Sequence, residues 1–461
     1  MFHDLSGDRI SVANDAARLA WNDTLEALLA HAAATPQHLA RTLEADPDFA
    51  LAHAAQGLML LSLARRELVA SARGCLAKAQ IAAVLRPVTR REHMVMEALA
   101  LWLDEAPCRA AERLEAILLA HPLDVLAIKL SHGIRFMLGD QAQMLASLRN
   151  VALGFGETHP LAGYVHGCYA FALEERGLYA EAERVGRRAV ALSPRDAWGR
   201  HAVAHVLEMT GRVDEGVAWL GDGRTWAHAN NLRFHIVWHL ALFRMEHGET
   251  AEVLRLYDEE IRAEPTDDYR DIANGAALLA RLDYAGVDVG ERWEELAEKA
   301  ERRVHDGRLV FADLHYALSL LGAGRQDMAE TIARQLVEDA QVHRSVERRT
   351  ASRNGALAAF GLIAFREGDY AEASRLLGAA RDGLVAIGGS HAQRDLFEQA
   401  YAESLIRSGS HQQAERILSE RLARRGGTNL FASQRLARLR GRSPGRLAAL
   451  AVASTPLAIA H

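Results

Sequence analysis

The chain has 461 residues, of which 49% are hydrophobic, 25% are charged and only 6% are aromatic. This apolar content can bury a large core, so the composition excludes a disordered chain. The formal net charge of −6, from 54 Lys and Arg against 60 Asp and Glu, argues against a general nucleic-acid binder, which carries a basic excess.

The N-terminal segment predicts neither export nor membrane insertion. Its first residues, MFHDLSGDRISVA, carry acids where a signal peptide needs bases, and no apolar run follows them. No stretch of 18 or more apolar residues occurs in the chain, so we expect no membrane span. The three cysteines form no CxxC pair and are too few for a disulfide framework. We therefore expect a cytoplasmic protein.

A 34-residue unit is clearest between Gly163 and Pro194. Two stretches rich in Ala, Leu, Arg and Glu, which favour helices, are joined by Gly177 and ended by the proline. Small residues, Ala170 and Ala182, stand where the two helices of a tetratricopeptide repeat approach each other closely. The next such glycine, at 211, follows after another 34 residues, so the unit predicts stacked antiparallel helix pairs.

Looser copies of this unit extend through most of the chain. Glycines between helical stretches and one diverged pair around residues 271–304 bring the expected number to roughly eight to ten pairs. Because neighbouring pairs bury a continuous core, we predict an all-α fold, a right-handed α-solenoid of tetratricopeptide-like pairs, as one continuous domain over residues 1–461. Residues 440–461, with arginines before an apolar tail, are expected to form a capping helix or tail. A membrane-surface or partner-binding segment is the alternative.

Histidines are concentrated in the middle of the chain. Eight of the 21 lie between His159 and His247, where an even spread would place about four. Two HxxxH pairs stand on the first helices of consecutive units, which line the concave surface of such a superhelix. Residues four apart share one helix face, and neighbouring helices lie about 10 Å apart. The sequence therefore predicts one cluster, formed by His201, His205, His235 and His239, with Glu208 one turn after His205.

Such a cluster has several possible uses. Neutral imidazoles with a carboxylate can bind a late divalent metal such as zinc, so these four histidines are the candidate metal ligands. They can also act as general acid and base, together with Glu208, or hold an anionic ligand. Some or all of them can instead be buried residues whose partners are backbone carbonyls or each other. The absence of HExxH argues against a metalloprotease of that type.

Further candidates for ligand binding surround the cluster. Cys168 is either a nucleophile or, more simply, a small buried residue. Ser390 or Asp395 can be the N-cap of a helix, whereas Arg394 can bind an anion in the groove. The full set of additional ligand-binding candidates is His132, His159, His166, Tyr169, Trp198, Trp238, His315, His391, Arg394 and Asp395.

Four segments resemble the tetratricopeptide repeat protein 38 family. They are YAFALEE (Tyr169–Glu175), the PRDAW to HVLEM block (Pro194–Met209), FHIVWHLALF (Phe234–Phe243) and GGSHAQRD (Gly388–Asp395). The resemblance extends over roughly residues 20–440 and implies a tetratricopeptide-like all-α fold without a settled activity. The family tends to have His-Asp near the position of His132, where Gly133 replaces the acid in this chain.

Two classes of function fit these observations. The first is a binding or scaffold protein whose concave groove, lined by the histidines, holds a small molecule or peptide. The second is an enzyme, a metal-dependent or histidine acid/base hydrolase or lyase that acts on a small polar substrate in the central cavity. The direction of the four imidazoles, and what lies between them, separates both classes from a purely structural role.

Overall fold

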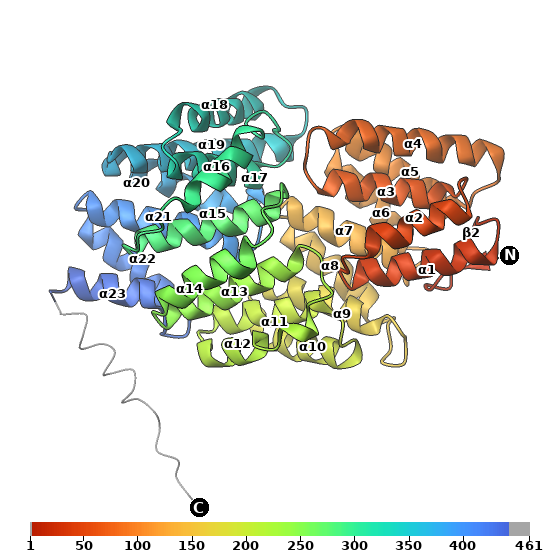
Figure 1. The fold of residues 1–461 in the computed structure, drawn as a ribbon, viewed down its shortest axis with the longest axis horizontal. Helices are drawn as coiled ribbons and strands as arrows, with labels where there is room; N and C mark the ends of the chain where they lie inside the picture. Colours follow the sequence, from red (N-terminus) through yellow and green to blue (C-terminus); the bar gives the residue numbers. More distant parts are fainter. Residues whose placement is uncertain (1, 442–461) are drawn as a thin grey trace, which may run out of the picture.

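The computed structural model describes residues 2–441, and this part of the chain is an all-α, right-handed solenoid of helix pairs (Figure 1). The first six pairs are α1 (Asp15–Leu29) and α2 (Thr35–Ala45), α3 (Ala50–Ser62) and α4 (Leu68–Leu85), α5 (Arg90–Leu103) and α6 (Pro107–Leu118), α7 (Val125–Met137) and α8 (Gln141–Ala152), α9 (Ala162–Glu174) and α10 (Tyr179–Leu192), and α11 (Ala197–Met209) and α12 (Val213–Leu220).

Five more pairs and a final helix follow. They are α13 (Leu232–Glu246) and α14 (Thr250–Leu256), α15 (Tyr269–Tyr284) and α16 (Arg292–Glu301), α17 (Val310–Gly322) and α18 (Gln326–Val342), α19 (Val346–Glu367) and α20 (Tyr370–Ala380), α21 (His391–Arg407) and α22 (His411–Arg424), and then α23 (Leu430–Leu439). Short irregular helices are η1 (Gly223–Thr225), the π-helical η2 (Tyr257–Ile261) and η3 (Arg381–Ile387). The described residues thus contain eleven pairs, one more than the upper number expected from the glycine spacing, and the diverged pair is α15 and α16.

The α9–α10 unit shows why the sequence forms these pairs. Gly177 joins the two helices with a φ of +73°, a backbone conformation that side chains other than glycine rarely adopt. Gly186 on α10 faces Val203 of the next unit so closely that a Cβ atom there would lie 2.7 Å from the valine Cγ2. Ala182, which is 1% exposed, packs in the same layer. Small residues therefore set the short distance between neighbouring helices.

The superhelix turns back on itself. Arg303, after α16, pairs with Glu67, at the start of α4, at 2.7 Å. The η3 segment lies against the end of α7, where Gly388 closely approaches the carbonyl of Met137. Figure 1 shows α21 beside α15 and α23 beside α13, and these helices are in contact. The C-terminal pairs therefore cover part of the surface formed by α9, α11, α13 and α15.

The core consists of two large apolar clusters. The first extends from the N-terminal hairpin to α13, and the second extends from α13 to α22. Met137, Trp226 and Leu240 contact both clusters. Helix α13, which carries His235 and His239, therefore lies where the two parts of the core meet.

A short hairpin precedes the solenoid, which the all-α expectation did not include. Strands β1 (Phe2–His3) and β2 (Arg9–Ile10) pair antiparallel. The buried guanidinium of Arg91 binds Asp4 of this hairpin at 2.7 Å and Asp124 at 2.9 Å. Because a buried arginine needs partners, this network holds the hairpin on α5 and α7.

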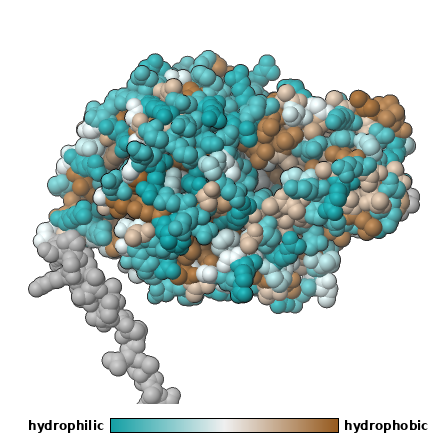
Figure 2. Space-filling model, viewed as in Figure 1, coloured by the Kyte–Doolittle hydropathy of each residue, from teal (hydrophilic) through white to brown (hydrophobic). Residues whose placement is uncertain are grey.

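One described helix, α4, is long and apolar enough to cross a membrane by length and composition alone, with a mean hydropathy of 1.4. Only 22% of that helix is buried; Ile81, Val84 and Leu85 are exposed. Figure 2 shows hydrophobic residues at the surface over the N-terminal helix pairs. The expected capping helix or tail of residues 440–461 lies, from residue 442 onward, outside the described residues.

Candidate metal centre

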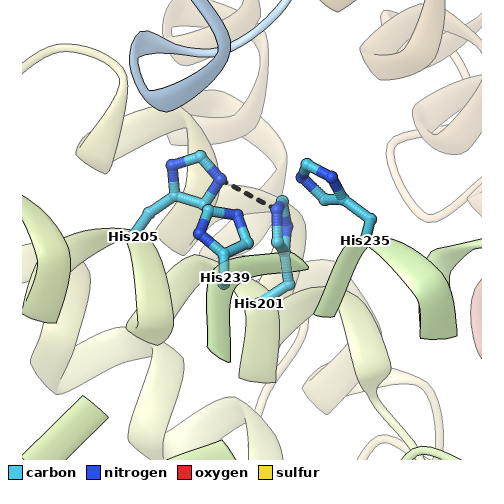
Figure 3. A group of neighbouring side chains, drawn as sticks. All are labelled: His201, His205, His235 and His239. Atoms are coloured by element: carbon cyan, nitrogen blue, oxygen red, sulfur yellow. Dashed lines mark hydrogen bonds between the residues drawn. The ribbon is translucent and has the colours of Figure 1, made fainter. Parts of the chain in front are cut away.

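Four histidine side chains converge between α11 and α13 (Figure 3). One ring nitrogen from each of His201, His205, His235 and His239 lies within 4.8 Å of the corresponding atom in every other. The two rings of α11 face each other with their Nε2 atoms 2.8 Å apart. A tetrahedral metal with bonds of about 2.0–2.1 Å separates its ligand atoms by roughly 3.4 Å. The spacing of the four imidazoles therefore suits a single metal ion.

The convergence follows from helix geometry. Each HxxxH pair places two rings on one face of its helix, one turn apart. The centroids of the His201 and His239 rings, which belong to different helices, are 5.1 Å apart, and those of His205 and His239 are 4.4 Å apart. The two helices thus present one joint surface of imidazoles.

Two of the four rings have a hydrogen-bond partner at the nitrogen that points away from the centre, and a third faces a carboxylate at a longer distance. Asn274 Oδ1, from α15, lies 2.7 Å from His235 Nδ1, and Glu208 Oε2 lies 3.1 Å from His239 Nδ1. Glu174 Oε2, from α9, faces His205 Nδ1 at 3.6 Å. Metal-binding histidines usually have such a partner, because it orients the ring and makes it a better ligand.

The centre is buried and its histidines are neutral. Burial lowers the pKa of His201, His205 and His239 well below the usual value, and repulsion among the rings adds to this effect. Burial lowers the pKa of the half-buried His235 to about 4, although its contact with Asn274 opposes the shift. The Nε2 atom of His239 has no hydrogen-bond partner among the described residues. Neutral imidazoles with unused nitrogens are the form in which histidine binds metals.

Aromatic rings surround the centre on two sides. Trp238 stacks on His235 with an angle of 13° between the rings, and Phe171 stacks on His201 at 21°. The Trp198 ring lies beside His201 at 4.8 Å and donates its N–H to His132 Nε2 at 3.1 Å. Trp198, Trp238 and His132 therefore hold and shield the four rings rather than face an open groove.

A second acidic group adjoins the centre. Glu174 and Glu175 bring carboxylate oxygens within 4.8 Å of each other and of His205. Glu174 is 0% exposed and neither of its oxygens has a donor among the described residues. Burial, with repulsion from Glu175 and Glu208, raises the pKa of Glu174 well above its usual value. Glu174 is therefore a buried carboxyl group with a raised pKa that lies beside the histidine cluster.

A layer of arginines and carboxylates separates the histidines from the C-terminal helices. Glu208, which holds His239, also binds Arg425 at 3.2 Å. Asp395 pairs with Arg425 at 3.2 Å and also binds Arg421. Although Asp395 is buried, the arginines Arg421 and Arg425 hold the pKa of its carboxyl group well below the usual range. The superhelix thus brings residues from α21 and α22 next to α11.

Several residues predicted as ligand-binding have other partners in the structure. Ser390 is the N-cap of α21, and Asp395 belongs to the ion-pair layer instead. Arg394 binds Glu175 at 3.2 Å and the carbonyl of Gly389, so its guanidinium is already engaged. Near the C-terminal layer, the His391 ring lies 2.8 Å from the Glu175 carbonyl.

Other predicted residues lie outside the centre because local contacts hold them. His166 Nε2 is 3.2 Å from the Phe155 carbonyl, and His315 Nδ1 is 2.7 Å from the Phe311 carbonyl. His159 packs its ring on Phe155 and accepts the N–H of Leu161. Tyr169 donates to Glu181 at 3.3 Å, and Cys168 is a buried thiol whose pKa burial raises.

Sequence reasoning missed two residues of the centre. Glu174 was only part of a family-like block, and nothing in the sequence distinguished Asn274. Sequence reasoning also missed the contact between Lys129 Nζ and His31 Nε2, which are 2.7 Å apart beside Trp198. All three depend on which helices pack together, and the spacing of residues within one unit does not show this.

No model of a known protein family matches the chain. Solved structures similar to it include the human IFIT1 dimer with m7Gppp-AAAA, at 15% identity over 94% of this chain and 100% of that chain, with a TM-score of 0.39. A monomeric IFIT1 mutant with Gppp-AAAA is also 15% identical, over 91% and 99% of the chains, with a TM-score of 0.39. Naa15/Naa10 bound to HypK-THB shows 11% identity over 94% and 68%, with a TM-score of 0.25.

Proposed function

We propose that this protein is a tetratricopeptide-like binding scaffold that holds a late divalent metal ion, zinc foremost, at the four histidines of α11 and α13. The observation that carries the proposal is the convergence of four ring nitrogens within 4.8 Å of one another. The contacts of Glu208 and Asn274 with the outward nitrogens support it, because they are the partners that a bound histidine needs. Imidazole ligands favour zinc and other late first-row metals over magnesium or calcium.

Metal analysis of the purified protein tests this function. Wild type loaded with zinc and then dialysed should retain about one zinc per chain, whereas His201→Ala/His239→Ala should retain almost none. His315→Gln is the matched control, because His315 is also a buried histidine on a first helix and its partner is a backbone carbonyl. If wild type and the double variant carry equally little zinc, the proposed function is wrong.

A metal-dependent enzyme, a hydrolase or lyase for a small polar substrate, is the second candidate. The buried Glu174 favours it, because a carboxyl group that has a raised pKa and lies 3.6 Å from His205 can serve as a general acid beside the metal. A catalytic metal keeps a coordination position for water or substrate, whereas a closed site does not. Cobalt-loaded protein should therefore change its visible spectrum on addition of azide if the site is catalytic, and keep it if four histidines close the site.

Membership of the tetratricopeptide repeat protein 38 family is part of this proposal. The blocks around Tyr169–Glu175 and Pro194–Met209 carry the resemblance, and they contain Glu174, His201, His205 and Glu208 of the centre. Cytoplasmic location, and a small molecule or peptide as the further partner of the scaffold, are proposals of the same kind. Fractionation of cells that produce the tagged protein tests the location.

A further inference from the structure

A cavity of about 410 Å³ opens beside the arginine layer, between α20, η3, α21 and α22. Its volume falls in the range of about 300–1,000 Å³ that is usual for small-molecule sites. Six arginines line it: Arg176, Arg381, Arg394, Arg421, Arg424 and Arg425. None of the four metal-centre histidines lines this cavity, so it is a separate feature of the molecule.

The lining of the cavity is positively charged in a protein that is negative overall. Its six arginines face three carboxylates, Asp382, Asp395 and Glu398, whereas the whole chain has a net charge of −6. Three of the arginines, Arg394, Arg421 and Arg425, are at most 9% exposed. Burying these cations costs free energy, so their concentration around one cavity favours a binding role for the cavity.

The carboxylates satisfy the inner arginines more fully than the outer ones. Asp395 binds Arg421 and Arg425, as described above. Arg381 has carboxylate oxygens no nearer than 3.6 Å, on Glu398 and Glu420. Arg176 is exposed, and its guanidinium group makes no hydrogen bond or ion pair with the described residues. The donors of these two outer guanidinium groups are therefore available to an anion.

One part of the cavity is apolar. Leu377 and Leu384 line it together with the rings of Phe397 and Tyr401. Each of these four side chains is at most 7% exposed. A ligand that fills the cavity would thus place an anionic group against guanidinium groups and an apolar or aromatic group against these side chains.

We propose that the cavity binds a small organic phosphate, with its phosphate group on the outer arginines, Arg176 and Arg381, and its apolar part against Leu384 and Phe397. Arginine is well suited to this role because its planar donors match phosphate oxygens. This proposal goes beyond the metal centre and does not depend on it, because the cavity residues are present whether or not the histidines bind zinc.

Calorimetric titration with phenyl phosphate, at about 0.15 M salt to screen loose ion pairing, tests the proposal. Wild type should bind phenyl phosphate, bind inorganic phosphate more weakly because it lacks the apolar part, and bind phenol least. Arg176→Gln/Arg381→Gln should weaken the binding of phenyl phosphate about tenfold or more.

Arg416→Gln is the control, because Arg416 lies on α22 with its side chain 72% exposed and does not line the cavity. It should leave the affinity unchanged. Absence of binding in folded wild type overturns the proposal, as does equal weakening in the double variant and the control. Tighter binding of inorganic phosphate than of phenyl phosphate overturns the assignment of an organic ligand. Zinc content measured in the same samples separates these outcomes from a failure of the metal site.

Discussion

Glu208 connects the histidine centre to the C-terminal arginines through its two oxygens. One oxygen lies 3.1 Å from His239 Nδ1 and the other 3.2 Å from Arg425. The first contact fixes the His239 ring so that Nε2 points to the other histidines. The second pairs this buried carboxylate with the buried guanidinium group at the end of α22.

Replacement of Glu208 by Gln should weaken zinc binding without preventing folding. The loss should be about 10- to 100-fold, the usual cost of removing an outer partner of a metal-bound histidine. Competition with a chromophoric chelator measures it. Glu246→Gln is the control, because Glu246 is a partly buried carboxylate that holds Asn429 and Leu430 instead of a histidine. Unchanged zinc affinity in Glu208→Gln would mean that this carboxylate does not support the site.

His132 should make the stability of the protein depend on pH. Its pKa is lowered to about 3 by burial and by Lys129, whereas it is near 6.5 in the unfolded chain. Between these two pKa values His132 is protonated in the unfolded state and neutral in the folded state. The free energy of unfolding therefore decreases as the pH falls below about 6.5. Between pH 7.5 and 5 this residue should cost the folded state about 2 kcal/mol, a loss that His132→Gln lacks.

Denaturant unfolding of both proteins across that range measures the difference. Other buried histidines and acids contribute to each curve, but their contributions are common to the two proteins. The slope for the variant should be shallower than that of wild type. Parallel curves would show that His132 takes up protons equally in both states.

The sequence predicted the clustering of the four histidines better than it predicted the residues that contact them. Two HxxxH pairs on consecutive first helices are enough to predict the convergence of His201, His205, His235 and His239, because both spacings are local. Glu174 and Asn274 come from neighbouring units, and their side chains reach the rings only through the angle between packed helices. His166 and His315, which the sequence offers as ligand-binding candidates, lie outside this cluster, and one nitrogen of each ring contacts a backbone carbonyl.

Helices α9 and α11 approach each other through glycines. A Cβ atom on Gly167 would lie 2.0 Å from Asp196 Oδ2 and 3.0 Å from the Cα of Gly199. Neither the helix backbone nor this buried carboxylate can move easily. The close contact sets the position of α11, and with it that of His201 and His205.

Gly167→Ala should therefore destabilise the protein by about 1–3 kcal/mol, the usual cost of overpacking. It should also weaken zinc binding, because α11 has to shift. Gly74→Ala is the control: Gly74 lies on α4 with open space around its missing side chain, so this variant should be neutral or slightly stabilised. Thermal unfolding and zinc titration of both variants test the prediction, and an equally stable Gly167→Ala would contradict it.

Glycine and proline spacing predicted the helix pairs well but not their irregular parts. The turn at Gly177 follows directly from the need for a positive φ. By contrast, the π-helical turn at Tyr257–Ile261 contains no glycine or proline, and the 3-10 segment at Arg381–Ile387 contains only Gly383, which the repeat spacing did not single out. They arise from packing against other units, which a repeat pattern does not contain.

The superhelix as a whole is closed by contacts between units that are far apart in the chain. Arg303 is 5% exposed and binds Glu67 at 2.7 and 2.8 Å, across 236 residues of sequence. Arg66 donates to the carbonyl of His305 in the same region. This closure could not be predicted from the sequence, because it depends on the small rotation between successive pairs summed over many units.

Arg303→Met should loosen this closure. The expected cost is about 1–3 kcal/mol, because Asp306 and Glu67 lose a buried partner. Hydrogen exchange should increase around the α3–α4 turn and around residues 303–308, whereas zinc binding should persist. Arg302→Met is the control, because Arg302 is the neighbouring residue and is exposed. This variant should change neither the stability nor the hydrogen exchange. Equal exchange in the two variants would contradict a closing role for Arg303.

X-ray absorption at the zinc edge of the zinc-loaded protein tests the central claim most directly. The metal centre predicts nitrogen ligands at about 2.0–2.1 Å with the multiple-scattering pattern of imidazole rings and no sulfur ligand. His201→Ala/His239→Ala should lose this signal. A spectrum with sulfur or mainly oxygen ligands in wild type, or the same spectrum in the double variant, would contradict a metal centre at these four histidines.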